Sequence, residues 1–223
     1  MEYSTVIEGH FISRPNRFIA MVEVNGQEEI CHVKNTGRCK ELLISGVRVV
    51  LEPSDKPSRK TKFDLIAVYK GDMLINIDSQ APNKVAFEYL CKLYPTAEIH
   101  PEFSIGQSRL DFLVEENGEK LFVEVKGCTL EKDGGAYFPD APTLRGVKHL
   151  RELISCVEQG HRAMALFIIQ MRPVSFLSPN DETHPEFGAA LRLAAESGVE
   201  IRAVDCIVEK NVLLAHEPVE IRL

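Results

Sequence analysis

The first 80 residues alternate apolar and polar side chains with a period of two, as expected for strands that bury one face. Asn25-Gly26 separates two of these segments and supplies the residues of a tight hairpin turn. The predicted strands are residues 5–12, 18–24, 29–34, 46–51, 62–70 and 73–77. Short strands joined by polar turns, with little helix, favour a small barrel, which we assign to a first domain at residues 1–80.

The pattern changes near Asp78, where apolar positions begin to recur at helical spacing. Thr143 is the predicted N-cap of one helix and Gly160 follows its end. Helices are predicted at residues 83–93, 144–158 and 185–197, and strands at 98–105, 109–115, 120–126, 162–171 and 199–206. Residues 127–142 are predicted to be a loop. This order predicts a second domain, residues 81–223, of α/β type with a mixed central sheet.

The composition is that of a globular protein without a membrane span. No stretch approaches the roughly 20 apolar residues that a bilayer requires, and the N-terminus lacks the basic start and apolar core of a signal peptide. We therefore expect a cytoplasmic protein. The six cysteines are scattered and form no CxxC pair, so we expect reduced cysteines that fill space.

The charge is distributed unevenly along the chain. Residues 1–80 carry equal numbers of acidic and basic side chains, so the whole net charge of −7 belongs to residues 81–223. This balance argues against a protein that coats nucleic acid. A nuclease site concentrates acids, however, so we expect any binding of nucleic acid to be salt-sensitive or to need a divalent cation.

Two carboxylates and an amine form the sharpest chemical feature. Glu124 and Lys126 share one face of a predicted strand, roughly 7 Å apart along it. Asp111 lies on the preceding strand, and the turn at Asn117-Gly118 is about midway between Asp111 and Glu124, so the two acids can sit side by side. The alternative is a solvated strand face that carries an ion pair.

Phosphodiester hydrolysis needs this combination of groups. Carboxylates hold Mg²⁺ or Mn²⁺, and the metal polarises the phosphate and activates a bound water. Lys126, between carboxylates, should stay charged and stabilise the transition state rather than act as a base. Two further acids could join as metal ligands: Glu88 on the preceding helix and Glu102 on the preceding strand. The alternatives are an exposed helix glutamate and a surface acid on an edge strand.

The helix that follows carries a polar side next to this predicted site. Arg145 and Lys148 lie along it with His149 beside them, and a polar side of this kind can grip a phosphate backbone. His149 could relay protons, although a histidine on the helix surface is the simpler interpretation. The alternative for the whole segment is a solvated amphipathic helix.

Several strings resemble one known family. FPDAPTLRGVKHLREL, SRLDF and VEVKG, with HVKNTGRCKELL and NRF near the N-terminus, closely resemble the sugar fermentation stimulation protein A (SfsA) family over nearly the whole chain. The resemblance implies an N-terminal OB-like small β-barrel followed by a PD-(D/E)XK nuclease-like α/β domain. It also implies a cytoplasmic prokaryotic protein, described as DNA-binding and linked to the regulation of sugar (maltose) metabolism.

The resemblance also points to particular residues. In the nuclease fold, the acid of the second core strand and the ExK of the third form the metal site, and Asp111, Glu124 and Lys126 match that motif. Asn35 and Arg38 of the NTGR string, and Arg17 of NRF, carry over as candidate contacts of the barrel to nucleic acid, since OB folds bind single strands with basic and aromatic side chains. The alternative for NTGR is a structural role at the domain junction.

Three functions compete at this point. The first is a metal-dependent nuclease, with DNA favoured over RNA as its partner. The second is a non-catalytic DNA-binding regulator on an inherited nuclease fold, although the chain has no helix-turn-helix signal. The third, a sugar-handling enzyme, has only the family name behind it. The sequence is compatible with a homodimer and gives no indication of a membrane partner.

Overall fold

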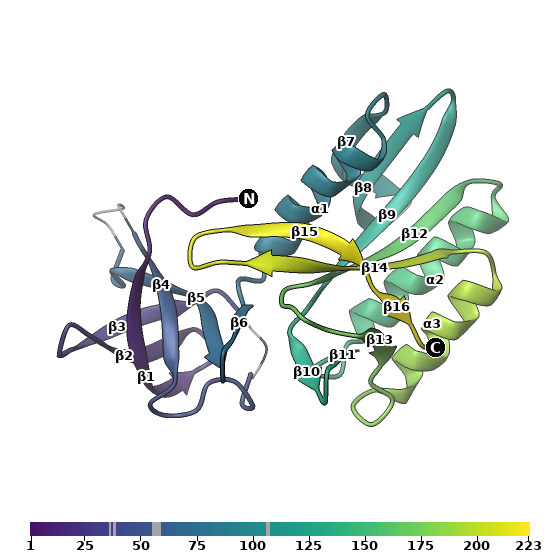
Figure 1. Cartoon of the computed structure of the whole chain (residues 1–223). Helices are drawn as coiled ribbons and strands as arrows, with labels where there is room; N and C mark the ends of the chain where they lie inside the picture. Colours follow the sequence, from purple (N-terminus) through teal and green to yellow (C-terminus); the bar gives the residue numbers. More distant parts are fainter. Residues whose placement is uncertain (36, 38, 55–58, 106–107) are drawn as a thin grey trace.

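A computed structural model describes residues 1–35, 37, 39–54, 59–105 and 108–223. The N-terminal part is a β-barrel and the C-terminal part a larger α/β domain beside it (Figure 1). The predicted fold class is confirmed, and each predicted helix and strand is present in the predicted order. No helix in the described ranges is long and apolar enough to cross a membrane.

In its described residues the barrel contains six strands: β1 (Ile7–Asn16), β2 (Ile19–Val24), β3 (Gln27–Val33), β4 (Arg48–Pro53), β5 (Phe63–Lys70) and β6 (Met73–Asn76). They follow the order β3-β2-β1-β4-β5-β6, and an additional pairing of β3 with β5 closes the barrel. The β2–β3 hairpin turns at Asn25 and Gly26, which both adopt positive φ as a tight turn of this kind requires. Ala20, Val22 and Val24 are buried inside, so the alternation predicted from sequence is observed.

The C-terminal domain is built on a six-stranded mixed sheet in the order β15-β14-β12-β9-β8-β7. Its strands are β7 (Glu98–Ile105), β8 (Ser108–Glu116), β9 (Glu119–Cys128), β12 (Arg162–Ile169), β14 (Glu200–Val208) and β15 (Leu213–Pro218). The central strands β9, β12 and β14 are parallel, and antiparallel strands flank them on both sides. The helices are α1 (Ala81–Leu93), α2 (Leu144–Glu158) and α3 (Pro185–Glu196).

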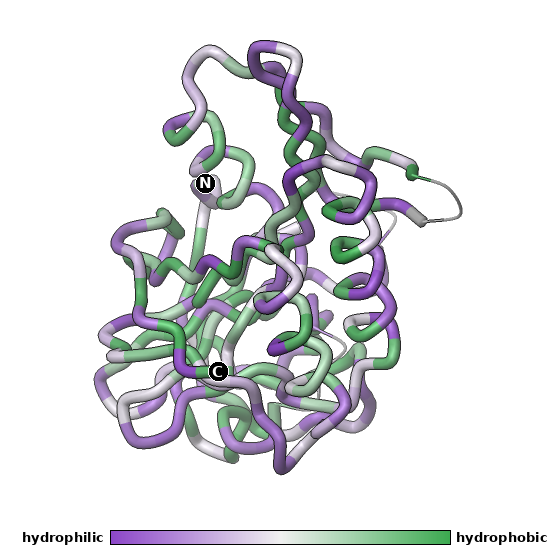
Figure 2. Tube along the Cα trace, turned by 90° about the vertical axis from the view of Figure 1, so that its right-hand side faces the viewer, coloured by the Kyte–Doolittle hydropathy of each residue, from purple (hydrophilic) through white to green (hydrophobic). Residues whose placement is uncertain are grey.

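The helices cover opposite faces of this sheet. One buried cluster joins α1 to β9 through Val85, Leu90 and Val123. The other packs α2 and α3 against the opposite face, through Leu150 and Phe187, and continues into the barrel interior. Hydrophobic and hydrophilic stretches alternate along the tube in Figure 2, as expected when an element buries one side. Five of the six cysteines are buried and all six are free, as predicted.

The prediction of a simple loop at residues 127–142 was wrong. This segment contains β10 (Leu130–Lys132) and β11 (Gly135–Phe138), which form a second sheet with β13 (Phe176–Pro179) and β16 (Glu220–Ile221). These strands are too short to show a period, and β11 pairs with a strand about forty residues away. The side chain of Phe176 packs directly on Gly135. Long-range pairing therefore decides this structure, and local sequence cannot reveal it.

Hydrogen bonds attach the barrel to the C-terminal domain. The Asn76 backbone N–H donates to the Gln170 carbonyl at 3.0 Å, and Gln170 Nε2 donates to Asn76 Oδ1 at 2.8 Å. Lys70 Nζ on β5 donates to the Glu131 carbonyl on β10 at 2.8 Å. The chain start and the β14–β15 hairpin add a further link, in which the Tyr3 N–H donates to the Asn211 carbonyl at 2.8 Å. The barrel and the chain start are thus held against β10, the end of β12 and the β14–β15 turn.

Candidate functional site

Asp111 lies on β8 beside the second half of β9. The β8–β9 ladder runs from Glu116–Glu119 to Phe112–Val123. Past the Phe112–Val123 pair, the Val125 N–H donates to the side chain of Asp111 instead of to a backbone carbonyl of β8. The distance from this N–H to Asp111 Oδ2 is 2.7 Å. The predicted hairpin therefore brings Asp111 next to the strand segment that carries Glu124 and Lys126.

The Glu124 carboxylate is buried and its two oxygens have different surroundings. Lys126 Nζ lies 2.5 Å from Oε1, and His149 Nδ1 also contacts Oε1. Oε2 is buried and has no hydrogen-bond partner among the described residues. Because a buried carboxylate oxygen without a partner is costly, this atom is available to a cation or to a hydrogen-bond donor from outside the chain.

The two acids differ in their electrostatics. Burial raises the pKa of Asp111, and the nearby Glu124 charge adds to this effect. Burial also acts to raise the pKa of Glu124, but the hydrogen bond from His149 and the charge of Lys126 outweigh it, so the net pKa is lowered. The site therefore holds one carboxylate that is firmly ionised and one whose charge is only partly compensated, which favours a cation near Asp111.

Helix α1 contributes Asn83, rather than the predicted Glu88, to the surroundings of Asp111. Asn83 Nδ2 donates to Asp111 Oδ1 at 2.8 Å, whereas Glu88 Oε2 lies 2.8 Å from the amino group of Met1. Five residues along a helix turn the direction of the side chain by about 140°, so positions 83 and 88 cannot both face Asp111. The structure does not bring Glu88 to the cluster. Sequence reasoning missed Asn83 because an amide at a helix start has no distinctive pattern.

Glu102 also stands apart from the other acids. It lies on β7 with a positive φ of 55°, and its exposed carboxylate pairs with Arg109 Nη1 at 3.4 Å. A direct role for Glu102 as a metal ligand therefore stays a prediction that this arrangement does not support.

Helix α2 presents its first two turns to the site. The Thr143 side chain caps the helix by accepting from the Gly146 N–H at 3.0 Å, as predicted. His149 is buried, with 6% of its surface exposed, so its interpretation as a surface histidine was wrong. Arg145 Nε donates to His149 Nε2 at 3.2 Å. Lys148 is exposed and pairs with Glu152 at 3.5 Å.

An open cleft of about 340 Å³ lies between the barrel and this site. Its lining comes from the barrel, the connecting segment, α1 and β9: Asn35, Gly37, Ser79, Pro82, Asn83, Val125, Gly127, Thr129, Asp140, Ala141 and Gln170. Asn35 of the NTGR string is held by its own bonds, since Nδ2 donates to the Ile77 carbonyl at 3.0 Å and Oδ1 accepts from the Gly37 N–H at 2.7 Å. Asn35 and Gly37 of this string are thus held by hydrogen bonds and also border the cleft.

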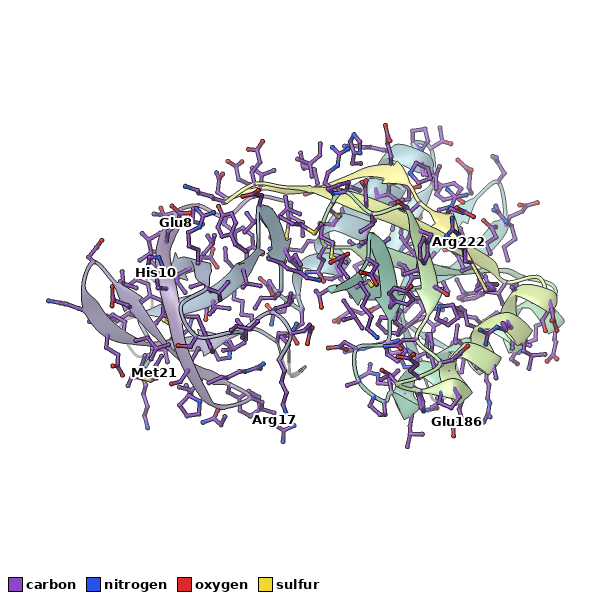
Figure 3. All side chains as sticks on the ribbon, turned by 60° about the horizontal axis from the view of Figure 1, so that its bottom comes forward. Glu8, His10, Arg17, Met21, Glu186 and Arg222 are labelled. Atoms are coloured by element: carbon purple, nitrogen blue, oxygen red, sulfur yellow. The ribbon has the colours of Figure 1, made fainter. Side chains whose placement is uncertain are left out.

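Arg17, the other described candidate on the barrel, is not part of the cleft lining. Arg38 lies outside the described residues. Arg17 projects from the barrel into solvent (Figure 3) and stacks over the Phe18 ring at 5.3 Å. The opposite wall contains Asp140 of the FPDA string, whose carboxylate faces Gly37: a Cβ at position 37 would lie 2.6 Å from Asp140 Oδ2. Sequence reasoning quoted this string without assigning Asp140 a role.

The donor set suits a cation that needs few protein ligands. Within the described ranges, no group of three or more His, Cys, Asp and Glu side chains stands in a metal-binding arrangement. Mg²⁺ usually keeps several waters and binds one or two carboxylates together with substrate phosphates. Asp111 and the free Glu124 Oε2 therefore fit Mg²⁺ or Mn²⁺, and they do not fit a closed zinc site.

Comparisons with known proteins agree over the whole chain. Residues 12–77 match the model of the SfsA N-terminal OB domain, and residues 80–212 match that of the sugar fermentation stimulation protein RE domain. Sugar fermentation stimulation protein homologs from Clostridium beijerinckii and Desulfitobacterium hafniense are 53% and 54% identical to this chain. These alignments cover 100% of this chain, and 100% and 99% of the respective relatives.

A solved structure gives the same result. The structure of Pyrococcus furiosus SfsA in complex with Ca²⁺ superposes with a TM-score of 0.89 at 30% identity, covering 100% of this chain and 98% of the other. Both domains are therefore shared, as well as their arrangement. The chain belongs to the sugar fermentation stimulation protein A family.

Proposed function

We propose that this protein is a metal-dependent phosphodiester hydrolase that acts on nucleic acid, with Mg²⁺ or Mn²⁺ held by Asp111 and Glu124. The observation that carries the proposal is Glu124 Oε2, a buried carboxylate oxygen without a partner next to a second carboxylate. A surface ion pair would not need to bury this group, so the alternative of a solvated strand face loses its support.

Each side chain has a distinct task in this proposal. A metal held by Asp111 and Glu124 would supply Lewis acidity toward the phosphate and would lower the pKa of a water ligand. Asn83 and the Val125 N–H hold the Asp111 carboxylate in place from two sides. Lys126 is largely buried against Glu124, and its amine lies beside the proposed position of the phosphate. There it stabilises the negative charge that develops in the transition state, or orients the attacking water.

Basic groups around the site provide contacts for the phosphate backbone. Arg145 and Lys148 are exposed on α2, and Arg17 lies on the barrel as a more distant contact. We place part of the nucleic-acid strand in the cleft of about 340 Å³ beside Asn35. The Ca²⁺ named for the Pyrococcus furiosus relative supports a divalent ion here, because Ca²⁺ and Mg²⁺ both prefer oxygen ligands.

The test is a panel of labelled single- and double-stranded DNA and RNA, incubated with Mg²⁺ or Mn²⁺. We expect cleavage by the wild type and a loss of at least about a hundredfold in Lys126→Met, the usual effect of removing one transition-state stabiliser. Lys120→Met is the matched control, because Lys120 lies on the same strand but is exposed and pairs with Glu115 at 3.4 Å. If the wild type cuts no substrate with either ion, the hydrolase proposal fails.

One observation favours a second candidate, a DNA-binding regulator that does not cut. The described residues contain no cluster of three acidic or other metal-binding side chains, and many nucleases use more than two acids. The same panel distinguishes the candidates: a regulator binds DNA with or without divalent ions and leaves it intact. Isothermal titration of Mn²⁺ into the wild type and Asp111→Asn separates them further, since only the hydrolase requires a difference in affinity.

A further inference from the structure

His149 connects an exposed arginine to the buried carboxylate, and this connection has a consequence for metal binding. We propose that His149 is a positioning residue: Arg145 holds one of its ring nitrogens, and the other holds Glu124 Oε1 so that Oε2 points to the cation. The proposal rests on the proposed function for the presence of the cation. It assigns to α2 a task other than contacting the phosphate backbone.

The chemistry of the groups decides which atom donates and which accepts in each hydrogen bond of His149. A guanidinium can only donate hydrogen bonds, so His149 Nε2, 3.2 Å from Arg145 Nε, must be the acceptor. A ring with an accepting Nε2 carries its hydrogen on Nδ1 and donates it to Glu124 Oε1. Arg145 therefore selects the tautomer, and the tautomer determines which ring nitrogen donates to the carboxylate.

Both donors to Glu124 act on the same oxygen. Lys126 Nζ and His149 Nδ1 contact Oε1 from β9 and from α2, and neither contacts Oε2. With Lys126 alone, the carboxylate could rotate about its last side-chain bond and exchange its oxygens, because that torsion is broad and roughly two-fold. A second donor from another element holds one orientation, and Oε2 remains available to a cation.

The position of His149 supports a fixed geometry. The residue is buried at 6% exposure in the second turn of α2, and its neighbour Leu150 belongs to the core between α2 and the sheet. Arg145 is exposed, so its terminal nitrogens can meet a phosphate while Nε stays on the histidine. One guanidinium can thus serve both the substrate backbone and the metal ligand.

Two amide substitutions separate this role from simple packing. In His149→Asn, the amide nitrogen stands the same number of bonds from Cβ as Nδ1, so the donor to Glu124 is kept. In His149→Gln, the amide group stands at the place of Nε2, so the contact with Arg145 is kept and the donor to Glu124 is lost. Glutamine is closer to histidine in size, so a packing role would favour His149→Gln over His149→Asn.

The experiment is isothermal titration of Mn²⁺ into the full-length protein and its variants. Loss of an outer partner of a ligand typically weakens metal binding about ten- to a hundredfold. We expect that loss in His149→Gln, and affinity within about threefold of wild type in His149→Asn and in Arg151→Gln, an exposed control on the same helix. Equal losses in both His149 variants, no loss in either, or a greater loss in His149→Asn would overturn the proposal.

Nitrogen NMR of the metal-free wild type provides a readout that needs no cation. We expect the His149 ring to carry hydrogen on Nδ1 and none on Nε2. A hydrogen on Nε2 would refute the positioning role proposed for His149. If the wild type binds no Mn²⁺, the proposed function fails by itself, and the ring tautomer then decides whether the contact from Arg145 through His149 to Glu124 exists.

Discussion

Gly127 follows directly after Lys126, and its missing side chain makes room for two neighbours. A Cβ at this position would lie 2.5 Å from Pro82 Cγ and 2.6 Å from Gln170 Oε1. Ordinary carbon contacts are about 3.5–4.0 Å, so Gly127→Ala must displace both. Gln170 is 2% exposed and donates to Asn76 Oδ1 and to the Asp78 carbonyl, so the displacement reaches the junction between the barrel and the C-terminal domain.

The magnitude follows from two effects. Overpacking a filled site costs about 1–3 kcal/mol, and weakening a buried hydrogen bond adds about 1–3 kcal/mol. We therefore expect Gly127→Ala to lower the free energy of unfolding by about 2–6 kcal/mol. Urea unfolding followed by circular dichroism and tyrosine fluorescence measures this, since the chain has five tyrosines and no tryptophan.

A double-mutant cycle with Pro82→Ala tests the cause. Removing the proline ring removes the nearest clash, so the cost of Gly127→Ala should fall by about 1 kcal/mol in the Pro82→Ala background. If the changes in unfolding free energy of the two substitutions are additive to within about 0.5 kcal/mol, steric contact with Pro82 is not the cause of the destabilisation. A stable Gly127→Ala protein with unchanged unfolding would refute the predicted clash directly.

Three further predictions concern single contacts. Asn83→Ala removes the donor to Asp111 Oδ1 and should weaken Mn²⁺ binding about tenfold in a titration; unchanged affinity would contradict the assigned role. Glu88→Gln should leave that affinity unchanged, because Glu88 pairs with the chain start, and a tenfold loss would restore it as a ligand. Burial acts to raise the pKa of Asp64, but hydrogen bonds, chiefly from Arg59, outweigh it and lower the pKa. The wild type should therefore have a higher free energy of unfolding than Asp64→Asn above about pH 4, and this difference should decline as the pH falls below that value. A difference in urea unfolding that grows on acidification would contradict the lowered pKa.

Periodicity predicted much of the site because the relevant rules are local. Alternation along β9 puts Val123 on the face covered by α1 and Glu124 on the face covered by α2, as observed. The turn at Asn117 and Gly118, both at positive φ, determines the register of the β8–β9 hairpin and so the position of Asp111. These features depend on residues close together in sequence, whose geometry backbone sterics restrict.

Other parts of the site depend on contacts between distant segments. Position 149 has the same helical pattern whether α2 is solvated or packed, and only the sheet beneath it makes His149 a buried partner of Glu124. Asn83 and Glu88 are equally plausible on a helix of unknown rotation, and the packing of α1 on the sheet selects Asn83. The second sheet arises from the pairing of β11 with β13.

The sequence by itself thus determined the order of the main helices and strands, the two-domain architecture and the strand faces that carry Asp111, Glu124 and Lys126. Only the tertiary structure decided which oxygen of Glu124 is left without a partner, which residue of α1 holds Asp111, and how the barrel borders the cleft. The physical reason is range: turn chemistry and periodicity act over a few residues, while burial and hydrogen-bond partners are set by segments that meet only when the chain packs.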